Sequence, residues 1–431
     1  MERPPVVSDD EQNGPRTAPP GLSGLARRRL LGAAAAVALG GVAGSGRADA
    51  EPDRVGARAA GTAAPEAGTA APAAPPARTP APPATRAAIR ALYVGTYTSS
   101  GGPGLEVAVY DPVSGSVHRS TALSTVADPS FLAARGSDVL YAVDENQDQV
   151  TAVAVAGGAP RVLNSGGTGG SGPCHLTVHA AGGHLLTANY GSGSVAVHRL
   201  AADGSLGRRT DLVRHTGSGP DPDRQSGPHT HMVLNDRTGG FVLAVDLGTD
   251  TVYTYRLATG TGKLTGVSTA QVTAGSGPRH AAFHPSGRHL YVANELGNSL
   301  TVCGYDPDSG RVTHGTSLPT VPGGGGSAPN YPAEVVVSAD GAFVYVSNRG
   351  HDSVARYAVG AGGGRLRLLD AVASGGAYPR HIALDPSGAW LFAANQNSGT
   401  VAVFARDEAT GALTPAGTPF AVTAPVCVLP Q

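Results

Sequence analysis

The 431-residue sequence is poor in cysteine and lysine. Its three cysteines, Cys174, Cys303 and Cys427, lie far apart, and Lys263 is the only lysine. Three scattered cysteines form no disulfide framework and have no metal-ligand spacing, so we expect them to be small buried apolar side chains. The sequence therefore predicts neither a metal site nor another cofactor.

Charged residues of both signs are also scarce. Only 15% of the residues are Asp, Glu, Lys or Arg, and the formal net charge is −1 at pH 7. A chain this close to neutrality has no overall field that would attract nucleic acid or a membrane surface. We therefore expect no nucleic-acid partner.

The sequence has no apolar run long enough for a comfortable permanent membrane span. The longest candidate follows the arginines at 27–29, continues in small apolar residues to Gly44 and ends at Ala48-Asp49-Ala50. A charged start, a short apolar middle and small residues at the end are typical of a signal peptide, here of the twin-arginine type. Residues 1–50 thus predict export to the periplasm, cell envelope or medium, without stable membrane insertion after cleavage. An uncleaved anchor is the alternative.

The next segment, residues 51–88, contains Ala, Pro, Thr and little else. It has too few large apolar residues to bury a core, so we expect a disordered linker.

Helical periodicity is absent after this linker, and a repeat takes its place. In each unit an extended run starts near a proline, a turn follows, and a second run ends in Asn or Asp. In three units the proline begins a Pro-x-His sequence. These ending residues recur at intervals of 45 to 57 residues: Asp144, Asn189, Asp246, Asn294, Asn348 and Asn395. A repeat of about this length in short β-rich runs is typical of four-stranded propeller blades.

The two ends of the repeat region complement each other. The first unit, starting near Leu92, lacks the opening strand, whereas residues 425–429 resemble an opening strand with nothing after it. Pairing of this C-terminal strand with the first blade would close the ring and remove exposed sheet edges. Residues 89–431 therefore predict an all-β, monomeric, seven-bladed β-propeller.

The repeat also predicts where polar residues converge. The first strand of a blade starts at one face of the ring, and the second strand returns to that face. The start of the first strand and the end of the second therefore lie on the same rim. The recurring Pro and Asn or Asp residues are expected to set strand starts and close turns. The recurring His175, His280 and His381 could either hydrogen-bond in the channel or take part in catalysis.

Departures from the repeat are more informative. They are His229, His231, Arg279, Glu295, Glu334, Arg349 and Arg380. Two long inserts, 214–227 and 321–331, are expected to open onto the same rim. Arginine binds carboxylate or phosphate oxygens, histidine exchanges protons near neutral pH, and glutamate can orient it or act as a base. Such a group suits hydrolysis of a small anionic ester or lactone: one arginine holds the anion, another stabilises the oxyanion, and a His or Glu activates water.

Several stretches together carry a family resemblance, among them Gly172-Pro173-Cys174-His175, Gly277-Pro278-Arg279-His280, Val292-Ala293-Asn294-Glu295 and Val346-Ser347-Asn348-Arg349. Through them residues 92–429 resemble the propeller-type lactonase family, which includes bacterial 6-phosphogluconolactonase and the fungal carboxy-muconate lactonising enzymes. The resemblance implies a seven-bladed fold, lactonase activity and a small-molecule lactone as substrate.

The fungal enzymes are thought to use a His, a Glu and two Arg on one rim. The resemblance thus implies catalytic roles for His229 or His231, for Glu295 and for Arg279, with Arg349 as the candidate for the second arginine. Arg349 and the other rim residues are expected to bind substrate: His175, His280, Glu334, Arg380 and His381.

Three functions stay open at this stage. The first is an exported lactonase that hydrolyses the ring ester of an anionic sugar-type lactone, as 6-phosphogluconolactonase does. The second is a non-catalytic exported propeller that binds a partner protein or a polysaccharide, because a fold alone does not decide function. The third is a muconate-type cycloisomerase.

Overall fold

The computed structural model describes residues 88–156, 159–325 and 329–431. The predicted signal peptide, residues 1–50, and the predicted linker, residues 51–88, lie outside the described residues except for residue 88. No helix within the described ranges is long and apolar enough to cross a membrane. Helical structure in these ranges consists of three short 3-10 segments, η1 (Thr98–Ser100), η2 (Pro322–Gly325) and η3 (Ala361–Gly363).

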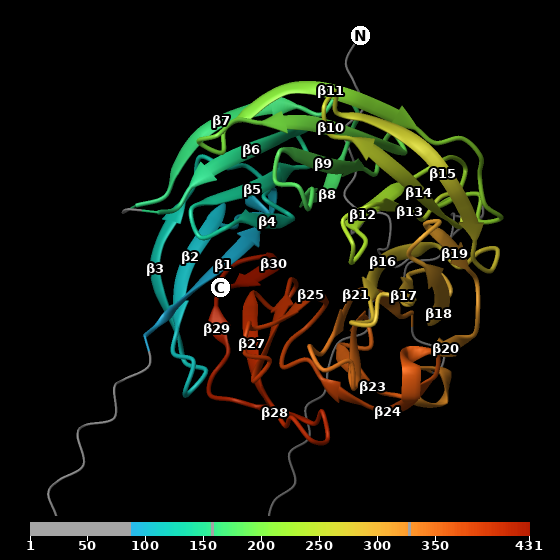
Figure 1. The fold of residues 1–431 in the computed structure, drawn as a ribbon. Helices are drawn as coiled ribbons and strands as arrows, with labels where there is room; N and C mark the ends of the chain where they lie inside the picture. The colour runs from blue at the N-terminus through green and yellow to red at the C-terminus, as the bar shows by residue number, and fades with distance from the viewer. Residues whose placement is uncertain (1–87, 157–158, 326–328) are drawn as a thin grey trace, which may run out of the picture. The chain divides into compact units, whose positions relative to one another are not determined.

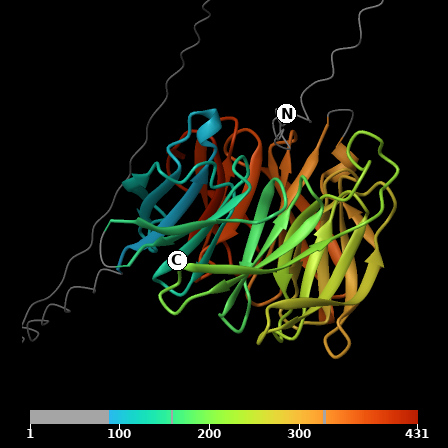
Figure 2. The same cartoon turned by 90° about the horizontal axis from the view of Figure 1, so that it is seen from above.

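The described residues form seven antiparallel sheets arranged in a ring (Figure 1), and the axis of this ring is called the channel below. This confirms the predicted seven-bladed β-propeller. Figure 2 shows the ring turned by 90°, with strands running between its two faces. Most of the second strand of each blade, counted from the channel, is buried on both faces by the neighbouring blades. In β13, for example, all five residues are buried. These strands are therefore almost continuously apolar.

The first four blades are given from the innermost strand outwards. They comprise β30 (Pro425–Pro430), β1 (Arg90–Thr96), β2 (Leu105–Tyr110) and β3 (Val117–Leu123); β4 (Leu132–Arg135), β5 (Val139–Asp144), β6 (Gln149–Ala154) and β7 (Arg161–Gly167); β8 (Pro173–Val178), β9 (His184–Asn189), β10 (Ser194–Leu200) and β11 (Leu206–Arg214); and β12 (Thr230–Asn235), β13 (Val242–Asp246), β14 (Thr251–Ala258) and β15 (Lys263–Gln271).

In blades five and seven two short strands share the outer edge. The last three blades comprise β16 (Pro278–Phe283), β17 (His289–Asn294), β18 (Ser299–Asp306), β19 (Arg311–Thr313) and β20 (Ser317–Pro319); β21 (Tyr331–Val337), β22 (Phe343–Arg349), β23 (Ser353–Val359) and β24 (Leu366–Ala373); and β25 (Pro379–Leu384), β26 (Trp390–Asn395), β27 (Thr400–Arg406), β28 (Leu413–Pro415) and β29 (Phe420–Ala421).

The C-terminal strand closes the ring, as the sequence predicts. β30 pairs antiparallel with β1, with Tyr93 opposite Leu429 and Val94 opposite Val428. Each innermost strand contacts the innermost strand of the next blade, in the cyclic order β30, β4, β8, β12, β16, β21, β25. The channel is therefore walled by seven strands from distant parts of the chain.

The hydrophobic core is divided into seven layers, one between each pair of neighbouring blades. One layer joins Leu92 and Tyr110 of the first blade to Phe392 of the seventh, and equivalent layers follow around the ring. Buried tyrosines tie some layers together through their hydroxyls. Tyr141 donates to the Gly204 carbonyl of the next blade at 2.8 Å, and Tyr345 donates to that of Gly411 at 2.7 Å.

A β-bulge at the start of several innermost strands aims side chains at the channel. In β16, Pro278 pairs with Asn294 but His280 pairs with Ala293, so Arg279 is the extra residue. The same shift occurs in β8 and β25. A bulge bends the strand and turns adjacent side chains to a common side. The Pro and Asn positions lie opposite each other, which agrees with the predicted common rim.

Gly95 tests the junction between the first two blades. A Cβ atom on Gly95 would lie 2.0 Å from the Pro129 carbonyl oxygen, which is backbone and cannot rotate away. Gly95→Ala should therefore lower the free energy of unfolding by at least about 1–3 kcal/mol, the usual cost of overpacking. Gly266, in outer strand β15, has nothing within 4 Å of its Cβ position. Gly266→Ala is the matched control, and equal urea midpoints for both variants would contradict the prediction.

Candidate active site

Three arginines converge on the carboxylate of Glu295 at the channel rim. Arg224 Nη2 lies 2.7 Å from Oε1, Arg279 Nε lies 3.1 Å from Oε2, and Arg349 Nη2 lies 2.6 Å from Oε2. All four residues are at most 5% exposed. These four side chains, called the arginine cluster below, carry three positive charges and one negative charge. Such a group attracts anions.

Three of the four members of the arginine cluster come from the repeat, each from a different strand or its end. Arg279 is the bulge residue of β16, Arg349 ends β22, and Glu295 directly follows β17. The Glu295 amide donates to the carbonyl of Gly277 at 2.8 Å, which holds the turn against the start of its own blade. The repeat thus positions three of the four side chains.

Arg224 comes from the insert between β11 and β12. Gln225 fixes this insert by donating to the Leu247 carbonyl and to Asp250 Oδ1, both at 2.8 Å. The start of the insert is anchored by His215, which lies 2.6 Å from Asp246 Oδ2 and 2.8 Å from the Tyr255 hydroxyl. The insert is therefore held at both ends, and Arg224 is brought to Glu295 by a rigid loop.

His229 and Tyr190 form the more open side of the cluster. Arg224 Nη2 donates to the Tyr190 hydroxyl at 3.1 Å, and the ring of half-buried His229 stacks on Tyr190 at 4.5 Å. His229 Nδ1 lies 2.9 Å from the Tyr190 backbone carbonyl oxygen. Because a carbonyl only accepts, Nδ1 carries the proton, and Nε2 of the neutral ring holds the lone pair. His229 can thus accept a proton at Nε2.

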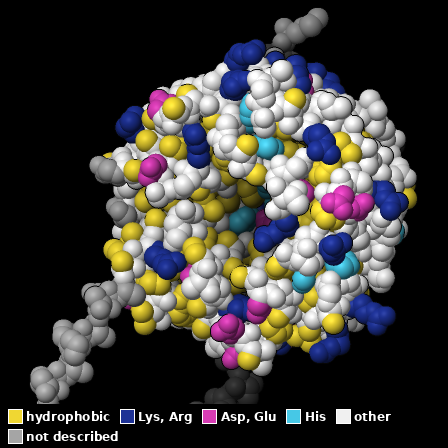
Figure 3. All heavy atoms as spheres, viewed as in Figure 1, with side chains coloured by type: hydrophobic (Ala, Val, Ile, Leu, Met, Phe, Trp, Pro, Cys, Tyr) yellow, Lys and Arg dark blue, Asp and Glu magenta, His cyan; other side chains and the backbone are white. Residues whose placement is uncertain are grey.

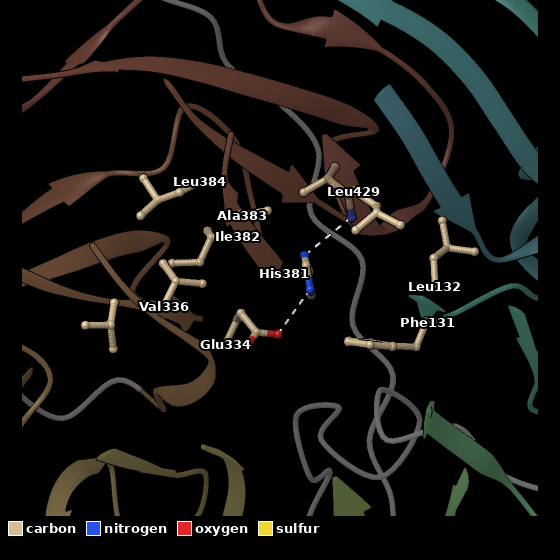
Figure 4. Close-up of a pocket in the computed structure, with 11 residues that line it drawn as sticks. Phe131, Leu132, Glu334, Val336, His381, Ile382, Ala383, Leu384 and Leu429 are labelled. Carbon is tan, nitrogen blue, oxygen red and sulfur yellow. Dashed lines mark hydrogen bonds and ion pairs between the residues drawn. The ribbon is translucent and has the colours of Figure 1, made fainter. Parts of the chain in front are cut away.

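The other predicted histidines form a second group deeper in the channel, around Glu334. His280 Nδ1 lies 2.7 Å from Glu334 Oε2, and His381 Nε2 lies 3.2 Å from the same oxygen. Figure 4 shows Glu334 and His381 facing each other beside Phe131. The Phe131 ring also contacts His175 at 3.9 Å, and His231 lies 5.1 Å from His280. This group is called the histidine cluster below.

Burial sets the protonation of the histidine cluster. It lowers the pKa of His175 well below the ordinary value of 6.5, and the neighbouring His280 adds to the effect. Burial also lowers the pKa of His280, helped by the Arg279 guanidinium, and it lowers the pKa of His381 against the opposing influence of Glu334. Burial raises the pKa of Glu334. The imidazoles of His175, His280 and His381 are therefore neutral near pH 7.

Arg380 belongs to neither cluster. Its Nη2 lies 3.7 Å from Glu145 Oε1, and its guanidinium lies 5.5 Å from the centre of the Tyr97 ring. The Tyr97 hydroxyl donates to Glu145 at 3.1 Å. Of the ten predicted site residues, the structure brings Arg279, Glu295 and Arg349 together. It puts His229 beside them and gathers five more in the histidine cluster: His175, His231, His280, Glu334 and His381.

Two cavities lie along the channel. A cavity of about 10 Å³ is lined by residues of the histidine cluster together with Arg279 and Arg380. A larger one, of about 370 Å³, has mainly aliphatic walls, with Glu334 and His381 among its lining residues. Its walls include Val337 and Leu384, the last residues of β21 and β25, so it opens at the opposite end of the channel. Figure 3 shows the ring hollowed at its centre, with apolar side chains around a histidine.

Sequence reasoning missed Arg224, Tyr190 and Glu145. Arg224 lies in the insert 214–227, which its length singles out, but nothing in that segment marks which residue turns inward. Tyr190 and Glu145 follow the turn Asn or Asp of their blades, the same repeat position as Glu295 and Arg349. Comparing this position across all blades would have found both.

Comparisons with known proteins agree with the fold. The sequence model of a family described as "Lactonase, 7-bladed beta-propeller" matches residues 91–430. The 6-phosphogluconolactonase of Bacillus subtilis (strain 168) is 35% identical over 346 residues, which cover 78% of this chain and 97% of that protein. The similarity therefore spans the whole propeller.

Solved structures give the same result. The crystal structure of a Lactobacillus plantarum protein is similar with a TM-score of 0.76 at 33% identity, covering 80% of this chain and 100% of the other. The periplasmic gluconolactonase of Pseudomonas aeruginosa is similar with a TM-score of 0.74 at 29% identity, covering 80% and 99%.

The buried histidines predict acid sensitivity of the fold. Below pH 6.5, His175 and His280 are protonated in the unfolded chain but stay neutral in the folded protein. The free energy of unfolding therefore falls as pH decreases. Above this pH the two residues contribute no slope. Each contributes up to about 1.4 kcal/mol per pH unit, measurable by urea unfolding between about pH 5 and 8.

His175→Gln should flatten this pH dependence. Equal slopes for the wild type and His175→Gln would contradict the assignment.

Proposed function

The chain belongs to the family of seven-bladed β-propeller lactonases, and from that premise we propose that it hydrolyses the ring ester of a sugar-type lactone that carries an anionic group. The observation that carries the anionic part is the arginine cluster, in which one carboxylate faces three guanidinium groups. Such an excess of fixed positive charge suits a phosphate or carboxylate on the substrate.

The chemistry assigns different tasks to the arginines. Water adds to the lactone carbonyl carbon, negative charge collects on the carbonyl oxygen, and the ring carbon–oxygen bond then breaks. Arg224 and Arg349 bind the anionic substituent, whereas Arg279, which also lines the small cavity next to the histidines, stabilises the oxyanion.

Glu295 orients the arginines. Both of its carboxylate oxygens accept ion pairs from the cluster, so it is better suited to fixing the guanidinium groups than to taking a proton. The proton of the attacking water then passes to an imidazole of the channel. The family resemblance offers His229 and His231 for this role, and His280 is a third candidate because it lines the same small cavity as His231.

We further propose the cellular localisation and the domain organisation that the sequence predicts. Residues 1–50 act as a twin-arginine-type signal, residues 51–88 as a linker, and residues 89–431 as a monomeric lactonase domain. The periplasmic address in the name of the Pseudomonas aeruginosa protein supports export. An exported enzyme meets sugar lactones outside the cytoplasm.

The first functional test compares Arg279→Ala with the wild type on a panel of lactones, including 6-phosphogluconolactone and gluconolactone. Acid release is followed with a pH indicator. We expect the wild type to open an anionic lactone and Arg279→Ala to lose about 100-fold or more of kcat, the scale for one oxyanion donor. Arg367→Ala, at an exposed residue of outer strand β24, is the control. An unchanged rate in Arg279→Ala would remove it from the mechanism.

The same panel separates the alternatives. Flat wild-type traces on every lactone would favour the non-catalytic binding propeller, and loss of a conjugated diene absorbance on a muconate would favour the cycloisomerase.

The second functional test asks whether Arg224 binds the anionic group of the substrate. Arg224→Gln should lower kcat/KM for 6-phosphogluconolactone by about 10- to 100-fold, which corresponds to a hydrogen bond to a charged group of about 1.5–3 kcal/mol. The loss on uncharged gluconolactone should stay below about threefold on the same scale. Equal losses on the two lactones would show that Arg224 supports the loop rather than the anion.

A further inference from the structure

A cavity the size of one water molecule lies between the arginine cluster and the histidine cluster. Its volume is about 10 Å³, and Ser130, Arg279, His280 and Arg380 are among the residues that line it. A cavity holds a water once it reaches about 10–15 Å³ and offers polar partners. The cavity is therefore large enough for one water and too small for a substrate.

Two polar atoms at this cavity need a partner. Among the described residues, His280 Nε2 and Ser130 Oγ are fully buried and hydrogen-bond to no protein atom. The two residues are only 2% and 4% exposed. Buried polar atoms nearly always bond to protein or to ordered water. A water in the cavity would satisfy both.

The hydrogen bonds around Glu334 determine which nitrogen of His280 carries the proton. The Val428 amide donates to His381 Nδ1 at 3.4 Å, so the His381 proton sits on Nε2 and points to Glu334 Oε2. The Val335 amide donates to Glu334 Oε1 at 3.1 Å. The carboxylate is thus an acceptor on both oxygens, which places a proton on His280 Nδ1, 2.7 Å away.

Neutral His280 consequently has its lone pair on Nε2, the atom that needs a partner. Burial and the Arg279 guanidinium keep the pKa of His280 low, so the ring starts the reaction uncharged. A carboxylate behind the opposite nitrogen holds the imidazole in this tautomer and stabilises the imidazolium that forms when it takes a proton.

We propose that His280, held by Glu334, is the general base of lactone hydrolysis and that the water of the small cavity is the nucleophile. The inference rests on the proposed function and names the group that takes the proton. The water oxygen bonds to the carbonyl carbon while its proton passes to His280 Nε2. The carbonyl oxygen becomes negative beside Arg279, the ring carbon–oxygen bond breaks, and His280 returns the proton to the ring oxygen to give a hydroxy acid.

His229 also has its lone pair on Nε2, but its surroundings differ. Its Nδ1 faces the backbone carbonyl of Tyr190, whereas Nδ1 of His280 faces the Glu334 carboxylate. It is half-buried at the mouth, beside the arginine cluster. His229 therefore contacts the substrate, whereas His280 takes the proton, and the two roles predict different kinetics.

The test compares His280→Gln and His229→Gln, with His284→Gln as the control outside both clusters. On the best lactone of the panel, His280→Gln should lower kcat by about 100-fold or more, the scale of general-base catalysis, with KM changed less than about threefold on that scale. His229→Gln should mainly raise KM. The wild type should show a solvent deuterium isotope effect on kcat that His280→Gln lacks. Thermal unfolding checks that each variant is folded.

Glu334→Gln keeps the size of the side chain but removes its charge. It should lower kcat and leave KM close to the wild-type value, because Glu334 acts through His280. A merely structural role would lower the midpoint of thermal unfolding without this split between kcat and KM.

The outcomes separate this inference from the proposed function. A wild type inactive on every lactone overturns the proposed function and, with it, any catalytic role of His280 in lactone opening. An active wild type whose His280→Gln variant keeps kcat within threefold, or whose His229→Gln variant alone loses kcat, overturns only the assignment of the base. Should His280→Gln not fold, a crystal structure of the wild type decides: an ordered water bonded to His280 Nε2 and Ser130 Oγ supports the proposal, and a cavity without water overturns it.

Discussion

The pairing of β30 with β1 is the contact on which the rest of the molecule depends. It places the last strand of the chain innermost in the first blade, between β25 and β4. Without it the channel would lack one of its seven walls, and β1 would present an unpaired edge. The pairing also affects the histidine cluster. The Val428 amide that fixes the tautomer of His381 belongs to β30, so ring closure helps to decide where a proton sits beside Glu334.

Within the closed ring, two sequence positions per blade can carry site residues, whereas the other repeated residues hold the blade together. The Asn at the end of a second strand ties its own blade together: Asn294 donates to the hydroxyls of Ser299 at 3.0 Å and Thr301 at 2.8 Å. The next residue is free to differ, and it is Glu295 in blade five and Arg349 in blade six. The bulge residue after the proline is the second variable position, occupied by Arg279 in blade five. A rigid frame with two free positions per blade lets side chains from distant blades meet at one mouth.

This division explains how much the sequence could predict. The fold follows from local information, because strand length, turn residues and the interval between repeats are all written along the chain. The common rim follows from strand direction. The partners of individual charges do not, because they depend on which blades face each other across the channel. Glu334 stands where a repeat histidine is expected, and its sequence position does not reveal that it binds His280 and His381 together. Arg224 lies outside the repeat, so only the folded insert brings it to Glu295.

The two buried carboxylates divide the site into two parts with opposite needs. Glu295 faces guanidinium groups, which stay charged at any physiological pH, and therefore keeps a permanent excess of positive charge for an anion. Glu334 faces imidazoles, which burial keeps neutral, and therefore can support a group that gains and loses a proton. Arg279 separates the two parts: it pairs with Glu295 and lowers the pKa of His280. In the mechanism proposed above, this guanidinium adds to the effect of burial in lowering the pKa of His280, and it faces the oxygen that becomes negative. In that mechanism Arg279 connects substrate binding to proton transfer.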